Sequence, residues 1–485
     1  MASKLKTINT TGNKTKIVAT LGPASNSAEK IRQLIIAGAS MFRLNTSHGS
    51  MEEHMETINK IREVSLDLQR CIPIMIDLQG PKIRVGNISE PVKVNIGDTV
   101  VLKHTKQQGK GILPVDYKGI ADDVSIGDTI LLDDGKVVLK VFKIDNKCVY
   151  TKVEHGNLIK PRKGINLPGS TSSVNILTPR DKGFIEFAVM QNVDYIALSF
   201  VRDEKDILLT KKYLKKLGDE YMPIIAKIEK PQAVENLEEI VKVSDGIMVA
   251  RGDLGIEMSP QDVPIVQKKI ISMANKYKKV CIVATQMLES MIEEPIPTRA
   301  EASDVANAII DGADAVMLSA ETAAGKHPIE AVKMMASIAK NTESSGLVKT
   351  NIETEIIDSY EITPQAVAHG AIRMAEDMNA KGILAFTHSG YTPKLLSKLK
   401  PSIPIIAISD SFQTCRRLNL YWDTYTFISD RDCVLDRNML LEIDRILKSK
   451  TNFKNDDKII IIGSIPKLIT GRTNFIRVHR IGAQK

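Results

Sequence analysis

The chain has 485 residues, and 66 Lys and Arg against 58 Asp and Glu give a formal net charge of +8. This length exceeds one ordinary hydrophobic core, so about two to four domains are expected. Hydrophobic residues make up 43% and charged residues 26%, which excludes a disordered or fibrous class. Aromatic residues make up only 4%, which argues against binding single-stranded nucleic acid by base stacking, and we expect no nucleic-acid partner.

The cysteines and the first residues favour a reducing compartment. The chain contains five cysteines: Cys71, Cys148, Cys281, Cys415 and Cys433. Their odd number, wide spacing and lack of a C-x-x-C pair disfavour a disulfide framework or a zinc site. Residues 1–16 have no apolar signal-peptide core, and no apolar run reaches transmembrane length. We therefore expect a cytoplasmic protein without a membrane partner.

Short apolar runs alternate with longer helical patterns along most of the first 346 residues. The runs that we predict as strands are 16–22, 41–45, 72–78, 193–200, 223–229, 245–251, 280–285 and 315–321. Alternating strands and helices predict a parallel sheet with right-handed crossovers. Eight such units predict a closed (β/α)₈ TIM barrel rather than an open doubly wound sheet.

Two regions depart from this alternation. Residues 82–160 hold short β-like runs with glycine turns, which predict a small β-barrel domain inserted after the third strand, where a lid over the active site would lie. The last 139 residues predict a doubly wound α/β domain with strands at 382–387, 404–409 and 458–464. The predicted division is a barrel of 1–81 and 161–346, a lid of 82–160 and a C-terminal domain of 347–485.

In a parallel barrel the functional side chains gather at the carboxyl ends of the strands. The polar residues at or just beyond the predicted strand ends are Arg43, Asn45, Ser47, His48, Asp77, Lys82, Arg84, Lys227, Glu229, Arg251, Gly252, Asp253 and Thr285. Charged groups at such positions are costly unless they are paired, bound to a metal or used in chemistry. The list therefore defines the candidate site.

Lys227 and Glu229 lie two positions apart in "IIAKIE" and share one face of the fifth strand. One interpretation is a purely structural ion pair. Asp253, one strand along, favours a functional one, because two carboxylates with waters and substrate oxygens form the sparse site that Mg²⁺ prefers. A lysine beside that metal adds positive charge where a transferring phosphoryl group needs it.

Two further segments carry candidate anion-binding groups. "ARGDLGIE" (250–257) predicts a short helix whose first backbone N–H groups could hold a carboxylate or phosphate, although a glycine-rich turn explains it equally well on its own. Arg43 in "FRLNTSHG" could bind phosphate or could be an ordinary solvated arginine. The neighbouring carboxylates favour the functional interpretation of both segments.

The motifs together resemble those of the pyruvate kinase family. They run in order along the whole chain: "KIVATLGPAS", "FRLNTSHGS", "DLQGPKIR", "KGINLPG", "IIAKIE", "DGIMVARGDLGIE", "ATQMLESM", "PTRAEASDVANAIIDGADAVMLSAET" and "GRTNFIRV". The resemblance implies transfer of the phosphoryl group of phosphoenolpyruvate to ADP, which gives pyruvate and ATP in the last step of glycolysis. It also implies a homotetramer.

The resemblance also implies roles for single residues. Mg²⁺, for which Mn²⁺ can substitute, would be held by Glu229 and Asp253. The catalytic residues would be Lys227, which bridges to the phosphoryl group, Arg43, which grips the phosphate, and Thr285, which belongs to the network that delivers a proton. The substrate would contact Arg43, Lys227, Arg251, Gly252, Asp253 and Thr285. The nucleotide would lie along Asn45, His48, Arg84 and Lys163, with Asp134 arriving on the closing lid.

The segment "DLQGPKIR" differs from the pattern of potassium-dependent members, which have Thr at Leu78 and Glu at Lys82. In those members K⁺ lies beside the residues that match Asn45, Ser47 and Asp77. We expect the Lys82 ammonium to supply the same single charge, so that K⁺ is not required. The alternative is that Lys82 points to solvent at the lid hinge.

The segment "FTHSGYTPKLL" (386–396) matches the loop where the family binds a phosphorylated effector. The candidate effector residues are Thr387, His388, Ser389, Gly390, Tyr391 and Thr392. This neutral, hydroxyl-rich loop favours a sugar monophosphate or a nucleotide monophosphate as allosteric activator. The alternative is a structural turn without a ligand, since such loops are common in α/β folds.

Two other functions compete with this assignment. Another metal-dependent barrel enzyme of phosphoenolpyruvate or pyruvate would use similar carboxylates, but would not need the lid or the third domain. A catalytically inactive, metabolite-sensing relative would not need to retain Lys227, Glu229 and Asp253 together.

Overall fold

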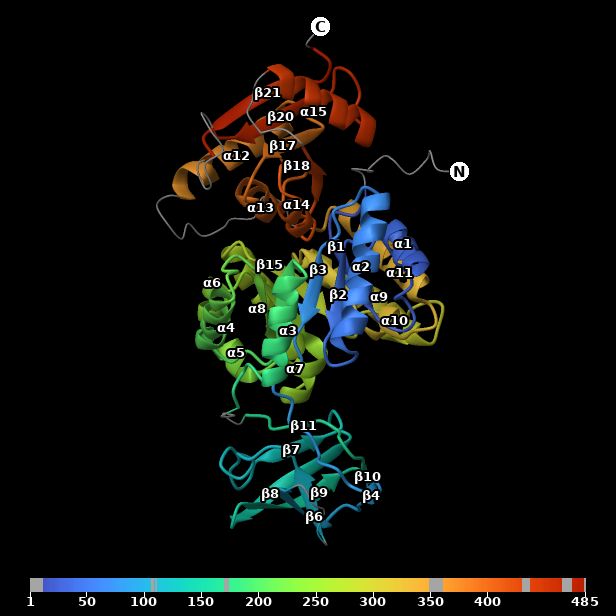
Figure 1. The fold of residues 1–485 in the computed structure, drawn as a ribbon, viewed down its shortest axis with the longest axis vertical. Helices are drawn as coiled ribbons and strands as arrows, with labels where there is room; N and C mark the ends of the chain where they lie inside the picture. The colour runs from blue at the N-terminus through green and yellow to red at the C-terminus, as the bar shows by residue number, and fades with distance from the viewer. Residues whose placement is uncertain are drawn as a thin grey trace.

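The computed structural model describes residues 12–105, 109, 111–169, 174–348, 361–429, 437–464 and 473–483. The barrel lies in the middle of an elongated molecule, with the β lid at one end and the C-terminal α/β domain at the other (Figure 1). This arrangement confirms the predicted fold class. Across these ranges, no helix is both long and apolar enough to span a membrane.

Eight parallel strands close the barrel in the order β1-β16-β15-β14-β13-β12-β3-β2. They are β1 (Lys16–Leu21), β2 (Met41–Asn45), β3 (Ile74–Asp77), β12 (Tyr195–Leu198), β13 (Ile224–Ile228), β14 (Gly246–Ala250), β15 (Val280–Ala284) and β16 (Ala315–Leu318). Each strand lies inside one of the eight predicted runs. Nearly every residue in them is buried, because helices cover the outside and side chains fill the inside.

Helices surround the barrel and connect its strands (Figure 1). They are α1 (Ala28–Ala37), α2 (Met51–Asp67), α3 (Pro179–Met190), α4 (Glu204–Lys216), α5 (Pro231–Glu235), α6 (Leu237–Val243), α7 (Arg251–Glu257), α8 (Val263–Lys276), η1 (Glu289–Ile292), α9 (Arg299–Ile310), α10 (Ala320–Ala323) and α11 (Pro328–Ser344). Ser50 and Thr178 begin α2 and α3 with capping boxes. Helix α7 follows β14 directly and, like α5, α6 and α8, has no side-chain cap.

The lid forms a six-stranded sheet in the order β11-β7-β8-β9-β5-β6 and a separate pair, β10-β4. The strands are β4 (Val92–Lys93), β5 (Thr99–His104), β6 (Ile112–Val115), β7 (Thr129–Leu132), β8 (Val137–Asp145), β9 (Cys148–His155), β10 (Leu158–Ile159) and β11 (Ile165–Asn166). The lid has its own hydrophobic core and lies between β3 and α3 in the chain. Its sheet extends past the predicted limit at residue 160, because β11 pairs with β7.

The C-terminal domain has a five-stranded sheet in the order β19-β18-β17-β20-β21. Its elements are α12 (Ile362–Asp377), β17 (Gly382–Phe386), α13 (Tyr391–Lys398), β18 (Ile405–Ser409), α14 (Phe412–Leu418), β19 (Thr424–Ile428), α15 (Arg437–Lys450), β20 (Lys458–Gly463) and β21 (Phe475–Arg480). The chain crosses from one side of β17 to the other, so the loop after β17 lies at the switch point where open α/β sheets bind ligands. The antiparallel β21 and the parallel edge strand β19 are absent from the predicted strands.

The C-terminal domain closes the barrel at the end opposite the lid. Its Ala407, Leu418, Leu420 and Tyr421 belong to the same apolar cluster as side chains inside the barrel. Beside this cluster, the Lys398 Nζ lies 2.5 Å from Asp314 Oδ2 and 2.7 Å from Asn275 Oδ1. The side chains of Lys398 and Asp314 are both 0% exposed, so the two domains share a buried ion pair.

We predict that Lys398→Met destabilises this joint strongly. The substitution leaves the Asp314 carboxylate buried without its cation, which typically costs about 3–5 kcal/mol. Arg373→Met is the control, since Arg373 is 75% exposed and pairs with Asp377 on the surface, a loss of less than about 1 kcal/mol. The measurement is the first unfolding transition in urea. Equal losses in the two variants would contradict the role of the buried pair.

Candidate active site

The ammonium of Lys227 lies at the centre of a cluster at the carboxyl end of the barrel. Its Nζ is 2.7 Å from Glu229 Oε1, 3.2 Å from Asp77 Oδ1 and 2.7 Å from the hydroxyl of Ser199. These groups come from β13, β3 and the end of β12, which are neighbours in the barrel. Sequence spacing alone predicted only the pairing of Lys227 with Glu229.

Arg43 joins the same cluster from β2. Its Nε donates to Asp77 Oδ2 at 2.6 Å, and its Nη1 donates to the hydroxyl of Thr20 at 3.0 Å. Asp77 is 1% exposed, and its carboxylate lies between two cations, Arg43 and Lys227. This arrangement presents two fixed positive charges to the mouth of the barrel, where they can stabilise a phosphate group.

Burial and charge act in opposite directions on these groups. Burial lowers the pKa of Lys227, but Asp77, Glu229 and Asp253 outweigh burial and raise that pKa above its ordinary value. Burial raises the pKa of Asp77, but Lys227 and Arg43 outweigh it and hold the pKa below its usual range. At Glu229 burial prevails, with the charge of Asp253 added to it, and raises the pKa to about 6 despite Lys227. The lysine therefore stays charged, and Glu229 takes up a proton more readily than an ordinary glutamate.

Glu229 and Asp253 are the residues that could hold a divalent cation. Glu229 Oε2 accepts a hydrogen bond from the backbone N–H of Phe200 at 2.9 Å. Asp253, in the first turn of α7, forms no hydrogen bond or ion pair with any residue that the structure describes, and is partly exposed. Within the described ranges, no three His, Cys, Asp or Glu side chains are arranged to hold a metal. Two hard carboxylates fit Mg²⁺, which keeps several waters or substrate oxygens as ligands.

The start of α7 and the residue after β15 form the predicted anion cradle. The Gly252 N–H donates to the hydroxyl of Thr285 at 2.7 Å, and Thr285 has a φ of 69°. The Arg251 guanidinium points away from a ligand position, since it donates to the Thr285 and Gln286 carbonyl oxygens, both at 2.8 Å, and pairs with Asp304. In this structure the Gly252 N–H and the Thr285 hydroxyl bond to each other, and the hydroxyl also donates to the Ala284 carbonyl oxygen at 2.6 Å, so an anion would have to replace these bonds.

The predicted nucleotide residues lie in two separate places. Asn45 and His48 belong to the loop between β2 and α2, where Asn45 Oδ1 accepts the Ser47 N–H at 3.1 Å. Arg84 bridges to Gly164 at the base of the lid, and its Nη1 donates to the Arg162 carbonyl oxygen at 3.1 Å. No hydrogen bond or ion pair between described residues joins the two places.

Lys163 and Asp134 lie on two separate loops of the lid that an ion pair joins. Lys163 pairs with Asp133 at 3.0 Å, whereas the next residue, Asp134, is exposed in a left-handed conformation with a φ of 57°. Figure 1 shows the lid strands β7 and β8, which flank Asp134 in the chain, extending away from the barrel.

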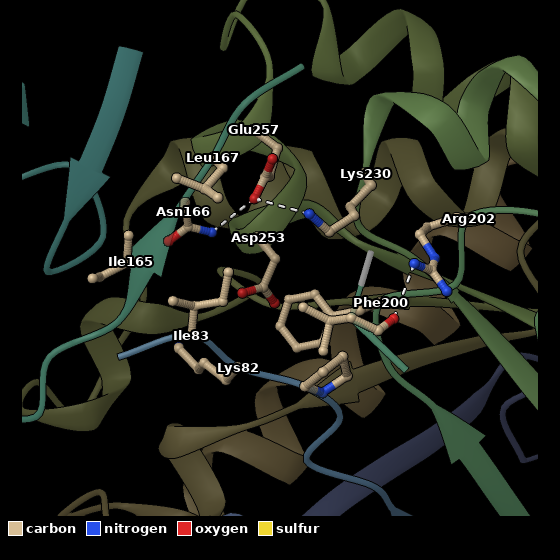
Figure 2. Close-up of a pocket in the computed structure, with 12 residues that line it drawn as sticks. Lys82, Ile83, Ile165, Asn166, Leu167, Phe200, Arg202, Lys230, Asp253 and Glu257 are labelled. Carbon is tan, nitrogen blue, oxygen red and sulfur yellow. Dashed lines mark hydrogen bonds and ion pairs between the residues drawn. The ribbon is translucent and has the colours of Figure 1, made fainter. Parts of the chain in front are cut away.

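Lys82 lines a cavity of about 40 Å³ between the lid hinge and the barrel, together with Asp253 (Figure 2). Its side chain packs closely against Gly164, where an added Cβ would lie 2.7 Å from Lys82 Cε. In the part of the chain that the structure describes, Lys82 has no ion pair with Asp77 or any other carboxylate. Its ammonium thus lies near the site without being neutralised.

The same cavity contains a polar group that sequence reasoning missed. Asn166 on the returning lid strand donates to Glu257 Oε1 at 2.9 Å, and Lys230 Nζ lies 3.6 Å from that oxygen. Figure 2 shows these three side chains meeting beside Asp253. Glu257 is on the same helix as Asp253, so it links the lid to the helix that carries a candidate metal ligand. Its position four residues after Asp253 was the only available signal.

The candidate effector loop follows β17. Thr387 accepts the Gly390 N–H at 2.8 Å, and Gly390 has a φ of 83° at the start of α13. His388 Nδ1 lies 2.8 Å from Asp410 Oδ1, and the hydroxyls of Thr392 and Thr473 lie 2.6 Å apart. Residues 471 and 472 of the "GRTNFIRV" motif lie outside the described ranges. Ser389 is exposed in this loop, next to the left-handed Gly390.

Comparisons with known proteins agree along almost the whole chain. The family model for the pyruvate kinase barrel domain matches residues 12–332, and that for the pyruvate kinase alpha/beta domain matches residues 365–479. The pyruvate kinase of Thermotoga maritima is 41% identical over 469 residues, which cover 96% of this chain and 99% of that protein. The pyruvate kinase of Thermococcus litoralis is 41% identical over 475 residues, which cover 97% and 99%.

A solved structure gives the same result. The crystal structure of a pyruvate kinase from Cryptosporidium parvum superposes with a TM-score of 0.89 at 33% identity, and covers 97% of each chain. The chain contains the barrel, the lid insertion, the C-terminal sheet and the Lys227 cluster, and it belongs to the pyruvate kinase family.

Proposed function

We propose that this protein transfers the phosphoryl group of phosphoenolpyruvate to ADP, producing pyruvate and ATP in the last step of glycolysis. The observation that carries the proposal is Lys227, only 11% exposed and kept charged by Asp77 and Glu229, beside Asp253, which has no ion-pair partner among the described residues. Phosphoryl transfer requires mainly positioning and charge stabilisation, which this cluster supplies without a nucleophile of its own.

The proposal assigns tasks to the residues of the site. Glu229 and Asp253 would hold Mg²⁺, or Mn²⁺ in its place, which when bound supplies positive charge to the substrate oxygens. Lys227 and Arg43 would contact the transferring phosphoryl group, since their charges face the barrel mouth. The Thr285 hydroxyl, with the Gly252–Asp253 backbone, would orient the substrate carboxylate and belong to the path that delivers a proton.

The proposal also assigns the nucleotide to the space between barrel and lid. Asn45 and His48 on the barrel side and Arg84 and Lys163 on the lid side are the groups that would contact it. Their separation in this structure is consistent with a lid that closes on the bound nucleotide and brings Asp134 with it. Lid closure would also exclude water from the transferring group.

We predict that Lys227→Met abolishes turnover while metal binding persists. The variant keeps Glu229 and Asp253 but loses the cation that faces the phosphoryl group, a loss on the order of 10³-fold or more in rate. Turnover is followed as pyruvate formed from phosphoenolpyruvate and ADP with and without Mg²⁺, and metal binding by Mn²⁺ titration. Lys182→Met, which removes a lysine that packs on Tyr213 outside the barrel, is the matched control.

The outcomes of that assay separate the competing functions. Near-normal turnover of Lys227→Met would refute the assigned role. No pyruvate from the wild type would indicate an inactive, metabolite-sensing relative. Pyruvate formed without ADP would indicate a different barrel enzyme of the same substrate.

We predict that Mn²⁺ binds more weakly as the pH is lowered through the raised pKa of Glu229. A pKa of about 6 keeps the carboxyl protonated up to higher pH than usual, so protons compete with the metal as the pH falls. At about pH 5.5 roughly a quarter of Glu229 would be ionised, against nearly all at about pH 7.5, which gives about fourfold weaker binding. An ordinary glutamate would change little over this range. Mn²⁺ titrations of the wild type and Glu229→Gln, followed by electron paramagnetic resonance at both pH values, measure the affinities. An unchanged wild-type affinity would contradict the prediction.

We also propose that the enzyme works without K⁺, with Lys82 in the place of the monovalent cation near Asn45, Ser47 and Asp77. The supporting observations are that Lys82 lines the cavity beside Asp253 and that no carboxylate among the described residues neutralises it. A K⁺ ion would bring a second charge to a place that already has one.

We predict that wild-type turnover is unchanged in K⁺-free buffer at constant ionic strength, and that Lys82→Glu acquires a K⁺ requirement. The substitution removes the built-in charge and adds an oxygen ligand for the ion. Lys82→Met is the companion variant, since it removes the charge without adding a ligand and should not be rescued by K⁺ to the same degree. Strong K⁺ stimulation of the wild type would refute the proposal.

The effector site completes the proposal. A sugar monophosphate or nucleotide monophosphate would bind the loop of residues 387–392 and activate the enzyme allosterically. The support is the glycine turn with its hydroxyl groups at the switch point of the C-terminal sheet. We propose the homotetramer and the cytoplasmic location on the family assignment alone.

A further inference from the structure

Lys230 follows the candidate metal ligand Glu229 directly in the chain and contacts two other parts of the site. Its backbone is extended, with a φ of −126° and a ψ of 147°, so its side chain points to the opposite side from that of Glu229. This side chain is only 13% exposed. Its ammonium lies 3.6 Å from Glu257 Oε1 and 5.8 Å from the centre of the Phe200 ring. One lysine thus contacts both helix α7 and the loop after β12.

The contact with Phe200 leads to Glu229. The Phe200 N–H donates to Glu229 Oε2 at 2.9 Å from a left-handed conformation with a φ of 59°. Aromatic residues rarely adopt this conformation, and it persists only where surrounding contacts determine it. Here the ring packs against Gly80, where an added Cβ would lie 2.7 Å from Phe200 Cδ2, and the Lys230 ammonium lies over the ring. Lys230 therefore helps to hold the N–H group that orients Glu229.

The contact with Glu257 leads to Asp253. The two carboxylates are one turn apart on α7, a helix of seven residues without a side-chain cap. Glu257 Oε1 also accepts a hydrogen bond from Asn166 of the lid strand β11 at 2.9 Å, whereas its buried Oε2 has no hydrogen-bond partner among the described residues. Figure 2 shows Asn166 and Lys230 approaching Glu257 from opposite sides. A buried carboxylate with so few partners depends on each of them, so these two residues fix the end of the helix that carries Asp253.

We propose that Lys230 is a positioning residue that sets the geometry of Glu229 and Asp253 for a divalent cation and couples both to the lid. Outer-shell partners of this kind orient the ligands of a metal. The inference rests on the proposed function, in which these two carboxylates hold the metal. The coupling acts in both directions: a bound metal fixes α7 and favours the contact of Glu257 with Asn166, and that contact in turn favours the metal. The alternative is a Lys230 that only neutralises Glu257.

The two alternatives predict opposite effects of Lys230→Met on metal binding. The substitution removes a positive charge near a cation site, so electrostatics alone predicts unchanged or tighter Mn²⁺ binding. Loss of positioning predicts weaker binding, since removal of an outer-shell partner typically weakens metal binding about 10- to 100-fold. The measurement is a Mn²⁺ titration of the full-length protein without substrate, followed by electron paramagnetic resonance.

We expect Lys230→Met to bind Mn²⁺ at least about tenfold more weakly than the wild type. Lys230→Arg should bind it nearly as tightly as the wild type, because a guanidinium can pair with Glu257 and stack on Phe200. Lys182→Met is the matched control, since Lys182 lies over the ring of Tyr213 at the same distance of 5.8 Å, outside the barrel. It should leave Mn²⁺ binding unchanged. Binding by Lys230→Met that equals or exceeds that of the wild type overturns the proposal.

Hydrogen exchange of the wild type tests the coupling to the lid without a substitution. We expect Mn²⁺ to slow amide exchange around β11, but not in β9, which lies three strands away in the same sheet. In Asn166→Ala, which removes the donor to Glu257, Mn²⁺ should still bind but should no longer slow exchange around β11. Exchange there that Mn²⁺ leaves unchanged in the wild type, or slows equally in Asn166→Ala, overturns the coupling. The wild-type result decides this point even if a variant fails to fold.

Pyruvate formation by the wild type, measured alongside, separates this inference from the proposed function. If the wild type forms pyruvate and Lys230→Met binds Mn²⁺ normally, the positioning role is refuted and the proposed function stands. A wild type that neither binds Mn²⁺ nor forms pyruvate refutes both.

Discussion

The ion cluster around Lys227 is the constraint on which the rest of the site depends. A buried ammonium is stable only where its carboxylates are fixed at short range, because an unpaired charge in the interior costs several kcal/mol. Asp77 on β3 and Glu229 after β13 supply these carboxylates, and the Ser199 hydroxyl, after the strand between them, accepts a further hydrogen bond from Lys227. The barrel must therefore close in one register, and closure brings Arg43 to the other side of Asp77.

Most of the fold and the centre of the site could be predicted from the sequence, because both follow from periodicity. Apolar runs of strand length identify the eight barrel strands, and residues at their carboxyl ends include Arg43, Asp77 and Lys227. The same rule applied to the first and fourth strands would have found Thr20 and Ser199. Arg251 shows its limit, since the position is correct but the guanidinium binds the loop after β15 instead of facing a ligand.

Other features depend on how separate domains meet, and no local pattern encodes that. Asn166 reaches Glu257 because the lid sheet returns to the barrel at one particular angle. Arg416 of α14 reaches Asp194 of the barrel because the C-terminal domain covers the barrel at one particular rotation. The strands β19 and β21 escaped prediction for a related reason: their sequences carry many polar residues, and pairing with β18 and β20 makes them strands.

The barrel interior has a further consequence at the end opposite the site. Ala407, Leu418 and Tyr421 of the C-terminal domain continue the apolar filling of the barrel, and Lys398 reaches Asp314 beside it. Side chains of the C-terminal domain thus close this end of the barrel. A fragment that ends at residue 348 would expose the apolar side chains at this end of the barrel, so we expect it to aggregate in isolation. Anyone who wishes to transplant this catalytic scaffold into a smaller protein must redesign that surface first.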